Sequence, residues 1–367
     1  MTTVPPTIPF LDVRAGYVEL RTEIDLAIAR VLESGVYILG DEVRAFEHEF
    51  ASYCGAAHCV GLGNGLEALR FALMALNVGP GDEVIVPSNT YIATWLAVAQ
   101  VGATPVPVEP DATHNLDPTL VERAITQRTR VVLPVHLYGQ PADLDPILSI
   151  ARRHGLRVLE DAAQAHGARY HGRRVGAHGD VVAWSFYPGK NLGALGDAGA
   201  ITTNDRDIAN HIRLLGNYGS PQKYVHEIAG ANSRIDPIQA AVLRVKLTHL
   251  DDWNTRRSAI AAHYLEALRD TPLILPTVAA GVNPAWHLFV VRSGRRDALQ
   301  HALTEGGIGT LVHYPKPPHL QGAFASLGLR SGTFPIAECL ANEVLSLPIG
   351  PHLQPDHVSA IIEACHP

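Results

Sequence analysis

Lysine is scarce in this chain. Only four lysines occur (Lys190, Lys223, Lys246 and Lys316), although Lys and Arg together number 29. Acidic residues number 36, so the formal net charge is −7 at pH 7, and no block of basic residues offsets it. Nucleic acid and anionic membrane surfaces are therefore not expected partners. The same scarcity leaves few candidates for a reactive amine.

Cysteine is equally scarce. The four cysteines (Cys54, Cys59, Cys339 and Cys365) are scattered, and no pair has the C-x₂-C spacing of a zinc or redox site. A chain of 367 residues is also far larger than the small scaffolds that depend on disulfides. We therefore expect reduced cysteines that mostly pack in the interior of a cytoplasmic protein, and no metal centre.

Long apolar runs are missing as well. No run approaches the about 20 residues that a membrane-spanning helix needs, and residues 1–6 lack the basic start and apolar core of a signal peptide. Hydrophobic residues make up 47% and charged residues 18%, the balance of an ordinary globular protein. The length is sufficient for a large core and for two domains.

Strand-like and helix-like stretches alternate through the first part of the chain. Such alternation predicts right-handed βαβ units, and hence an α/β fold with a mainly parallel central sheet flanked by helices. The strand-like stretches are residues 57–63, 83–87, 104–108, 130–135, 156–160, 180–184 and 198–203. The helix-like stretches are residues 65–73, 91–101 and 146–154.

The pattern changes near residue 237. Residues 238–250 form a long amphipathic stretch, a second helix-like stretch covers 258–268, a strand-like run covers 286–292, and a helix-like stretch covers 296–306. We therefore predict a large domain, residues 1–250, that includes an N-terminal arm. A smaller α+β domain is predicted for residues 251–367.

Lys190 stands on a short loop directly after the apolar run 180–184. The run reads as a buried strand and the Gly-Lys-Asn-Leu-Gly that follows as a turn. A lysine brought into an interior is costly unless its charge is removed or used, and the usual uses are a Schiff base or a general base. The alternative from this segment alone is a solvated turn residue.

Asp161 stands at the end of another strand-like run, 29 residues before Lys190. The carboxyl ends of parallel strands are where α/β sheets bind ligands. A pyridoxal 5'-phosphate (PLP) site needs a lysine and an acidic partner for the pyridine nitrogen. Asp161 and Lys190 fit that pair of roles.

A glycine cluster at residues 61–66 joins a strand to a helix, where backbone N–H groups can bind an anion. It is not a full G-x-G-x-x-G motif, because Leu66 stands at the third glycine position, and this disfavours a nicotinamide cofactor. Ser185 offers a second phosphate contact. Tyr91, at the next strand-to-helix turn, could stack on a cofactor ring, or it is simply a half-buried aromatic residue in a loop.

Taken together, these motifs resemble the PLP-dependent nucleotide-sugar aminotransferases of the DegT/StrS type, which have the aspartate aminotransferase fold (PLP fold type I). The resemblance runs nearly from end to end. The matching segments are residues 8–12, 79–84, 134–139, 160–167, 185–191, 230–234 and 345–348.

The resemblance implies a role for each matching residue. Lys190 would hold PLP covalently, and Asp161 would pair with its ring nitrogen. Gln164 would contact the side of the ring that carries the hydroxyl group, and Asn232 would reach the phosphate of the neighbouring subunit in an obligate homodimer. The other cofactor contacts implied are Tyr91 on the ring and Gly65, Leu66 and Ser185 at the phosphate.

The resemblance also implies a reaction. L-glutamate would donate its amino group in a ping-pong mechanism to the C3 ketone of a dTDP-3-keto-6-deoxyhexose, as in macrolide deoxysugar pathways. Tyr187, His313 and Tyr314 would surround the sugar. The alternatives are a C4-keto sugar, a keto-inositol, or a non-catalytic PLP-binding regulator. His319 either reaches the substrate or is a solvated loop residue, and it is not included in the site.

Overall fold

The computed structural model describes residues 8–366; the segment 1–6, predicted not to be a signal peptide, lies outside them. Its centre is a seven-stranded sheet in the order β1-β9-β8-β5-β4-β2-β3. Only β9 runs antiparallel to its neighbours, so the predicted, mainly parallel sheet is confirmed. The strands are β1 (His58–Leu62), β2 (Glu83–Pro87), β3 (Thr104–Val108), β4 (Thr129–Val132), β5 (Arg157–Asp161), β8 (Val181–Ser185) and β9 (Gly199–Thr203).

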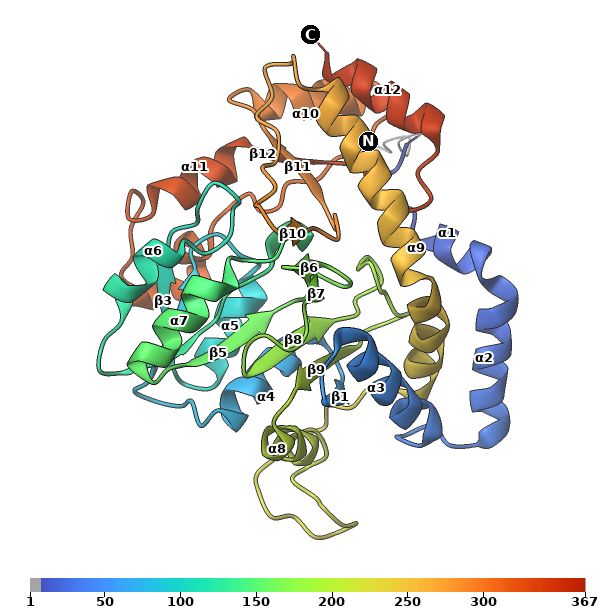
Figure 1. Cartoon of the computed structure of the whole chain (residues 1–367), viewed down its shortest axis with the longest axis vertical. Coiled ribbons are helices and arrows are strands. Elements are labelled where there is room, and N and C mark those ends of the chain that lie inside the picture. Colours follow the sequence, from blue (N-terminus) through green and yellow to red (C-terminus); the bar gives the residue numbers. More distant parts are fainter. Residues whose placement is uncertain (1–7, 367) are drawn as a thin grey trace.

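Helices cover both faces of this sheet (Figure 1). Strands covered on both faces read as near-continuous apolar runs, and in β2 all five residues are buried, the apolar Val-Ile-Val-Pro following Glu83. One face packs on α4 (Gly65–Ala75), α5 (Ile92–Gln100) and α8 (Arg206–Gly216). The other packs on α3 (Asp41–Cys54), α7 (Leu144–His154) and the first half of α9 (Pro237–Ala267).

A separate hydrophobic cluster lies in the C-terminal part, between the second half of α9, α10 (Arg296–Glu305), α12 (Pro355–Cys365) and the antiparallel pair β11 (Phe289–Arg292) and β12 (Val344–Leu347). The two helical stretches predicted at 238–250 and 258–268 are one helix, α9, of 31 residues. Because α9 runs through residue 250, the proposed division between residues 1–250 and 251–367 stays a prediction.

The other elements are short or peripheral. The other α-helices are α1 (Val13–Glu19), α2 (Arg21–Ser34), α6 (Pro118–Val121) and α11 (Pro335–Glu343). Four short 3-10 turns are η1 (Glu122–Ala124), η2 (Leu137–Gly139), η3 (Pro318–Leu320) and η4 (Gly322–Leu327). A small three-stranded sheet comprises β6 (Arg169–Tyr170), β7 (Arg173–Arg174) and β10 (Val282–Asn283).

All four cysteines are free and three of them are buried, as the sequence predicts. Within residues 8–366, no helix has both the length and the apolar character required to cross a membrane.

Candidate active site

Lys190 lies in a loop that joins β8 to β9, residues 186–198, which we call the lysine loop. The backbone N–H of Lys190 donates to the carbonyl of Tyr187 at 2.8 Å, and that of Ala194 donates to the carbonyl of Phe186 at 2.8 Å. The side chain is only partly accessible to solvent. Burial lowers the pKa of its amine to about 8, and the nearby Asp161 carboxylate opposes that shift. A useful fraction of the amine is therefore neutral near pH 7, as a proton-transferring lysine requires.

The two acids at the end of β5 point to opposite faces of the sheet, because side chains alternate along a strand. Glu160 is fully buried and lies 2.9 Å from Nε2 of His136, away from the lysine loop. Asp161 is buried beside Lys190 and accepts hydrogen bonds from Thr94 Oγ1 at 2.9 Å and from the Ala163 N–H at 3.1 Å. Only Asp161 is thus available to the site.

Burial raises the pKa of Asp161, whereas these two donors and the Lys190 amine oppose the rise. A buried carboxylate of this kind is costly without a cation close to it. Its position at the carboxyl end of a central strand suits the protonated ring nitrogen of PLP, which would provide that cation.

Gln164 joins two tyrosines on the other side of Asp161. Its Nε2 donates to the hydroxyl of Tyr314 at 3.1 Å, and its Oε1 accepts from the backbone N–H of Tyr138 at 2.6 Å. The ring of Tyr314 lies 5.4 Å, centroid to centroid, from that of Tyr91, the exposed residue that precedes α5. Three residues assigned from the sequence to the ring and the substrate therefore form one group.

Gly65 is the first residue of α4, and Asn64 caps this helix by accepting the N–H of Glu67 at 2.9 Å. A Cβ atom at Gly65 would lie 2.7 Å from Cβ of Ser185, so only glycine allows the helix start to approach Ser185 this closely. The start of a helix attracts anions, and Leu66 adds a second N–H there. These residues fit the phosphate of PLP, just as Lys190 and Asp161 fit its ring.

His313 and Tyr187 come from different segments of the chain, His313 from the C-terminal part and Tyr187 from the lysine loop. His313 Nδ1 is 2.8 Å from the hydroxyl of Ser346, and its carbonyl accepts the hydroxyl of Tyr138. Burial lowers the pKa of His313 to about 4, so its ring is neutral at pH 7. Tyr187 is on the lysine loop with 60% of its surface exposed.

The structure adds Thr94 and Tyr138, to which the sequence analysis gave no site role, although Tyr138 lies in the matching segment 134–139. Thr94 lies on α5, three residues after Tyr91, and this spacing puts both residues on one side of the helix. The sequence therefore contained a pattern from which Thr94 could have been predicted. Tyr138 contacts both Gln164 and His313, which are 149 residues apart in the chain. No local pattern reveals such a contact.

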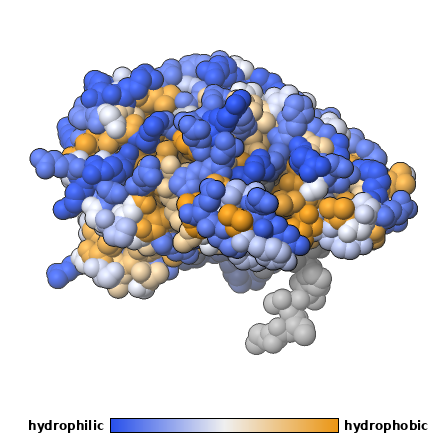
Figure 2. All heavy atoms as spheres, turned by 90° about the horizontal axis from the view of Figure 1, so that it is seen from below, coloured by the Kyte–Doolittle hydropathy of each residue, from blue (hydrophilic) through white to orange (hydrophobic). Residues whose placement is uncertain are grey.

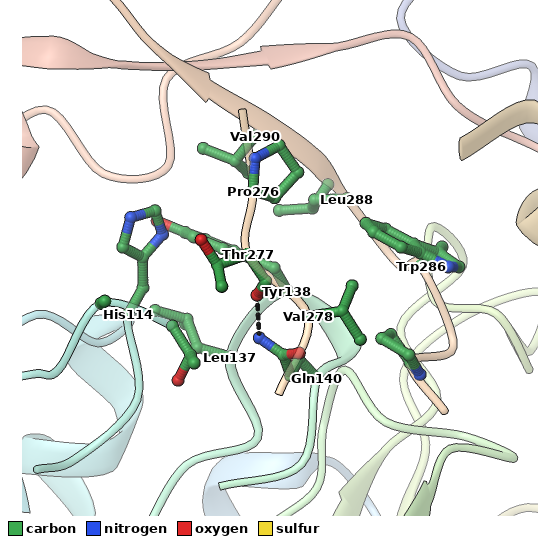
Figure 3. Close-up of a pocket in the computed structure, with 13 residues that line it drawn as sticks. His114, Leu137, Tyr138, Gln140, Pro276, Thr277, Val278, Trp286, Leu288 and Val290 are labelled. Carbon is green, nitrogen blue, oxygen red and sulfur yellow. Dashed lines mark hydrogen bonds between the residues drawn. The ribbon is translucent and has the colours of Figure 1, made fainter. Parts of the chain in front are cut away.

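A small cavity lies on the far side of Tyr138, between Gln140, Thr277 and Trp286 (Figure 3). Gln140 Nε2 closes it by donating to the carbonyl of Thr277 at 3.0 Å. Its volume of about 30 Å³ is enough for a single water molecule and far too small for a sugar. We therefore do not assign it a substrate.

Asn232 and His319 lie elsewhere. Asn232 is exposed and pairs with Asn217 at the base of the loop that projects below α8 (Figure 1). The structure does not bring it to the Lys190 group of its own chain. The solvated-loop interpretation of His319 is wrong, because its side chain is 1% exposed and its Nε2 lies 3.0 Å from Glu338.

The comparison with known families decides the class of this protein. A model of the DegT/DnrJ/EryC1/StrS aminotransferase family matches residues 18–366. The chain belongs to this family. The aminotransferase is PLP-dependent, so the predicted α/β fold, PLP cofactor and transaminase class are confirmed.

Two curated relatives and one solved structure are especially similar. The aminotransferase is 61% identical to the erythromycin biosynthesis sensory transduction protein EryC1 of Saccharopolyspora erythraea, over 97% of this chain and 99% of the relative. It is 59% identical to the dTDP-3-amino-3,4,6-trideoxy-alpha-D-glucose transaminase of Streptomyces venezuelae, over 98% and 95%. The S. venezuelae DesV structure in complex with a ketimine intermediate superposes with a TM-score of 0.96 at 58% identity, over 98% of each chain.

Proposed function

We propose that this aminotransferase transfers the amino group of L-glutamate to the C3 ketone of a dTDP-3-keto-6-deoxyhexose, in the biosynthesis of an antibiotic deoxyaminosugar. The observation that carries the substrate class is the 59% identity, nearly end to end, to a dTDP-3-amino sugar transaminase. The site holds the amine and the buried carboxylate that the reaction needs. Its free, mostly buried cysteines suit a reducing compartment, and we place the enzyme in the cytoplasm.

PLP, when bound, links covalently to amines and accepts the electron pair released at the neighbouring carbon. Lys190 is the residue that would hold it. With a pKa about one unit above pH 7, roughly one Lys190 amine in ten is neutral at that pH. Once displaced by the donor, its Nζ would move a proton from Cα of glutamate to the cofactor carbon. In the sugar half of the cycle it would move a proton from the cofactor carbon to C3 of the sugar.

Asp161 and its donors would hold the nitrogen end of the ring. The hydrogen bonds from Thr94 and Ala163 occupy one lone pair on each carboxylate oxygen and fix the orientation of the group. The remaining lone pairs are available for the proton on the ring nitrogen. Gln164, fixed by Tyr138 and Tyr314, would line the side of the ring that carries the hydroxyl group.

Tyr187, His313 and Tyr314 would contact the sugar. The neutral ring of His313 and the hydroxyls of the two tyrosines are hydrogen-bonding groups suited to hydroxyl groups rather than to a charge. His313 and Tyr314 reach the site from the C-terminal part of the chain, whereas Tyr187 reaches it from the lysine loop. A sugar between them would be held from two sides.

The substrate assignment is tested by running the reaction in reverse. Purified PLP-loaded enzyme receives a dTDP-3-amino-3,6-dideoxyhexose and, in a matched sample, the 4-amino isomer, while the loss of PLP absorbance is followed. Only the 3-amino sugar should convert PLP to its amine form. Conversion by the 4-amino isomer alone would refute the C3 assignment, and a glutamate control confirms that the preparation is competent.

We also propose that the enzyme is a homodimer in which Asn232 of each subunit contacts the phosphate in the active site of the other. Asn232 is exposed and its backbone pairs with Asn217 rather than with the Lys190 group of its own chain, which suits a residue that serves a second subunit. Figure 2 shows apolar patches among polar residues on the lower face of the molecule. Seven large side chains with apolar surface are exposed in two segments. They are Val36, Tyr37, Ile38 and Leu39 between α2 and α3, and Tyr218, Tyr224 and Val225 on the projecting loop.

Subunit mixing tests this arrangement. Homodimers of Lys190→Ala lack the amine, and homodimers of Asn232→Asp place a negative charge against the phosphate. A mixed dimer would contain one intact site, so random mixing should restore about a quarter of all sites. Activity that never exceeds the sum of the two inactive parents would contradict shared sites.

A further inference from the structure

Lys246 is a buried cation for which the reaction has no use. It lies on α9 within the apolar layer between this helix and the central sheet, and only 5% of its surface is exposed. Burial lowers the pKa of its amine to about 8, and no neighbouring carboxylate offsets that shift. A charge in such a place is costly unless it makes a specific contact.

The contact that Lys246 makes is with the lysine loop. Its Nζ donates to the carbonyl of Gly193 at 2.7 Å. Gly193 is three residues after Lys190, and within residues 8–366 no backbone N–H reaches that carbonyl. The buried amine of one lysine therefore holds the loop that carries the other.

Two further residues of α9 contact the same loop. Asn254 Oδ1 accepts from the side-chain amide of Asn191 at 2.9 Å, and Gln239 Oε1 accepts from the backbone N–H of Leu195 at 2.7 Å. Gln239, Lys246 and Asn254 are spaced seven and eight residues apart, or two helical turns each, so they lie on one side of the helix. Every second loop residue from 191 to 195 is thus attached to α9.

The loop itself has little freedom to adjust. A Cβ atom at Gly193 would lie 2.3 Å from the carbonyl oxygen of Pro188, so these two parts of the loop are in direct contact. Asn191, besides its bond to Asn254, donates to the carbonyl of Ala285 at 2.7 Å. A shift at residue 193 must therefore be transmitted to Lys190.

We propose that Lys246 is a positioning residue for Lys190: with Gln239 and Asn254 it fixes the lysine loop onto α9 and so sets where the reactive amine lies. The inference rests on the assignment of Lys190 as the PLP-binding residue. Reacting groups need to be held within a fraction of an ångström of the productive geometry, and a supporting layer of contacts supplies this.

The direct test is Lys246→Met, which keeps the length of the side chain and removes the donor. Hydrogen–deuterium exchange of the apoenzyme reports whether the loop is held, through the amides of Lys190 and Ala194. We expect exchange there to be about tenfold faster than in the wild type, equal to about 1.4 kcal/mol. The apparent affinity for PLP should fall by a similar factor, and the pKa of the PLP–lysine linkage, read from its visible spectrum, should shift.

Tyr264→Phe is the matched control. It removes another buried hydrogen bond from the same helix, that of the Tyr264 hydroxyl to the carbonyl of Pro348 at 2.9 Å, remote from the lysine loop. It should lower the melting temperature without changing loop exchange, PLP affinity or the spectral pKa. If Lys246→Met behaves in the same way as this control, Lys246 is merely structural and the proposal is wrong.

A second variant tests the proposal if Lys246→Met is unstable, and the wild type tests the assignment of Lys190. If Lys246→Met does not fold, Gln239→Met removes the neighbouring attachment at Leu195, and unchanged loop exchange in that variant would overturn the proposal. If PLP is found on a residue other than Lys190 in the wild type, the assignment of Lys190 fails. The apoenzyme exchange experiment would still show whether α9 holds the loop.

Discussion

Thr94→Val removes one hydrogen bond from the carboxylate that we assign to the ring nitrogen of PLP. Valine has the shape of threonine, so no cavity forms, and the Thr94 side chain is fully buried, so water cannot replace the lost donor. Hydrogen bonds to charged groups contribute about 1.5–3 kcal/mol. Because the Ala163 N–H still contacts Asp161, we expect the lower figure, which corresponds to roughly tenfold weaker PLP binding.

The loss should depend on pH in a defined direction. Burial already raises the pKa of Asp161 in the folded protein, and the Thr94 hydroxyl opposes that rise. Without the hydroxyl the pKa rises further, so the carboxylate takes up a proton at a higher pH than in the wild type. A protonated Asp161 cannot pair with a protonated ring nitrogen. The affinity defect of Thr94→Val should therefore grow as the pH is lowered.

The assay is a titration of apoenzyme with PLP at several pH values, with Thr94→Ser as the control because serine keeps the hydroxyl. Thr94→Ser should bind PLP nearly as the wild type does. Equal PLP affinity in folded Thr94→Val, at every pH, would refute the claim that Thr94 supports Asp161 in binding the cofactor.

Three further predictions follow from contacts and pKa shifts in the site. Gly65→Ala places a methyl group 2.7 Å from Cβ of Ser185, and overpacking of this kind costs about 1–3 kcal/mol, so PLP should bind at least about fivefold more weakly in the same titration. Asp161→Asn should make the apoenzyme more stable than the wild type at pH 7 in thermal unfolding. A raised pKa means that the folded state favours the neutral carboxyl group, so the ionised carboxylate at pH 7 destabilises the wild type, and asparagine removes that charge. PLP binding by Asp161→Asn should nevertheless collapse. Burial lowers the pKa of His166 to about 3, so the stability that this neutral ring contributes is present above pH 6.5 and lost as pH falls. Between pH 6.5 and 5 the free energy of unfolding, measured in urea, should fall by about 2 kcal/mol for this reason. His166→Leu should abolish that fall, and a fall of the same size in the variant would contradict the lowered pKa of His166.

The strands and most helices could be predicted because their apolar periodicity is local. The runs 156–160 and 180–184 are strands as expected, and Tyr91 does stand directly before a helix. The amphipathic stretch 238–250 was expected to continue toward the helix-like stretch 258–268. The two are one helix, α9, although a periodic pattern alone does not exclude a turn between them.

Local patterns pointed to site residues only beside the ends of strands and helices: Asp161 ends β5, Lys190 lies on the loop after β8, and Gly65 begins α4. Gln164 and Tyr314 were assigned only through the resemblance to a family. The attachment of Lys246 to Gly193 and the contact of Tyr138 with His313 link residues 53 and 175 positions apart. These contacts depend on how the layers pack, which a single sequence does not encode in any short pattern.

Two lysines in this protein are buried enough to have a pKa of about 8, Lys190 and Lys246, and only Lys190 lies beside Asp161. The account therefore depends on which of them carries PLP. We would reduce the PLP-loaded enzyme with borohydride, digest it and locate the modified residue by mass spectrometry. The account predicts stable labelling at Lys190 in a folded protein, with Lys246 unmodified. Labelling at Lys246, or at no lysine in a yellow preparation, would contradict it.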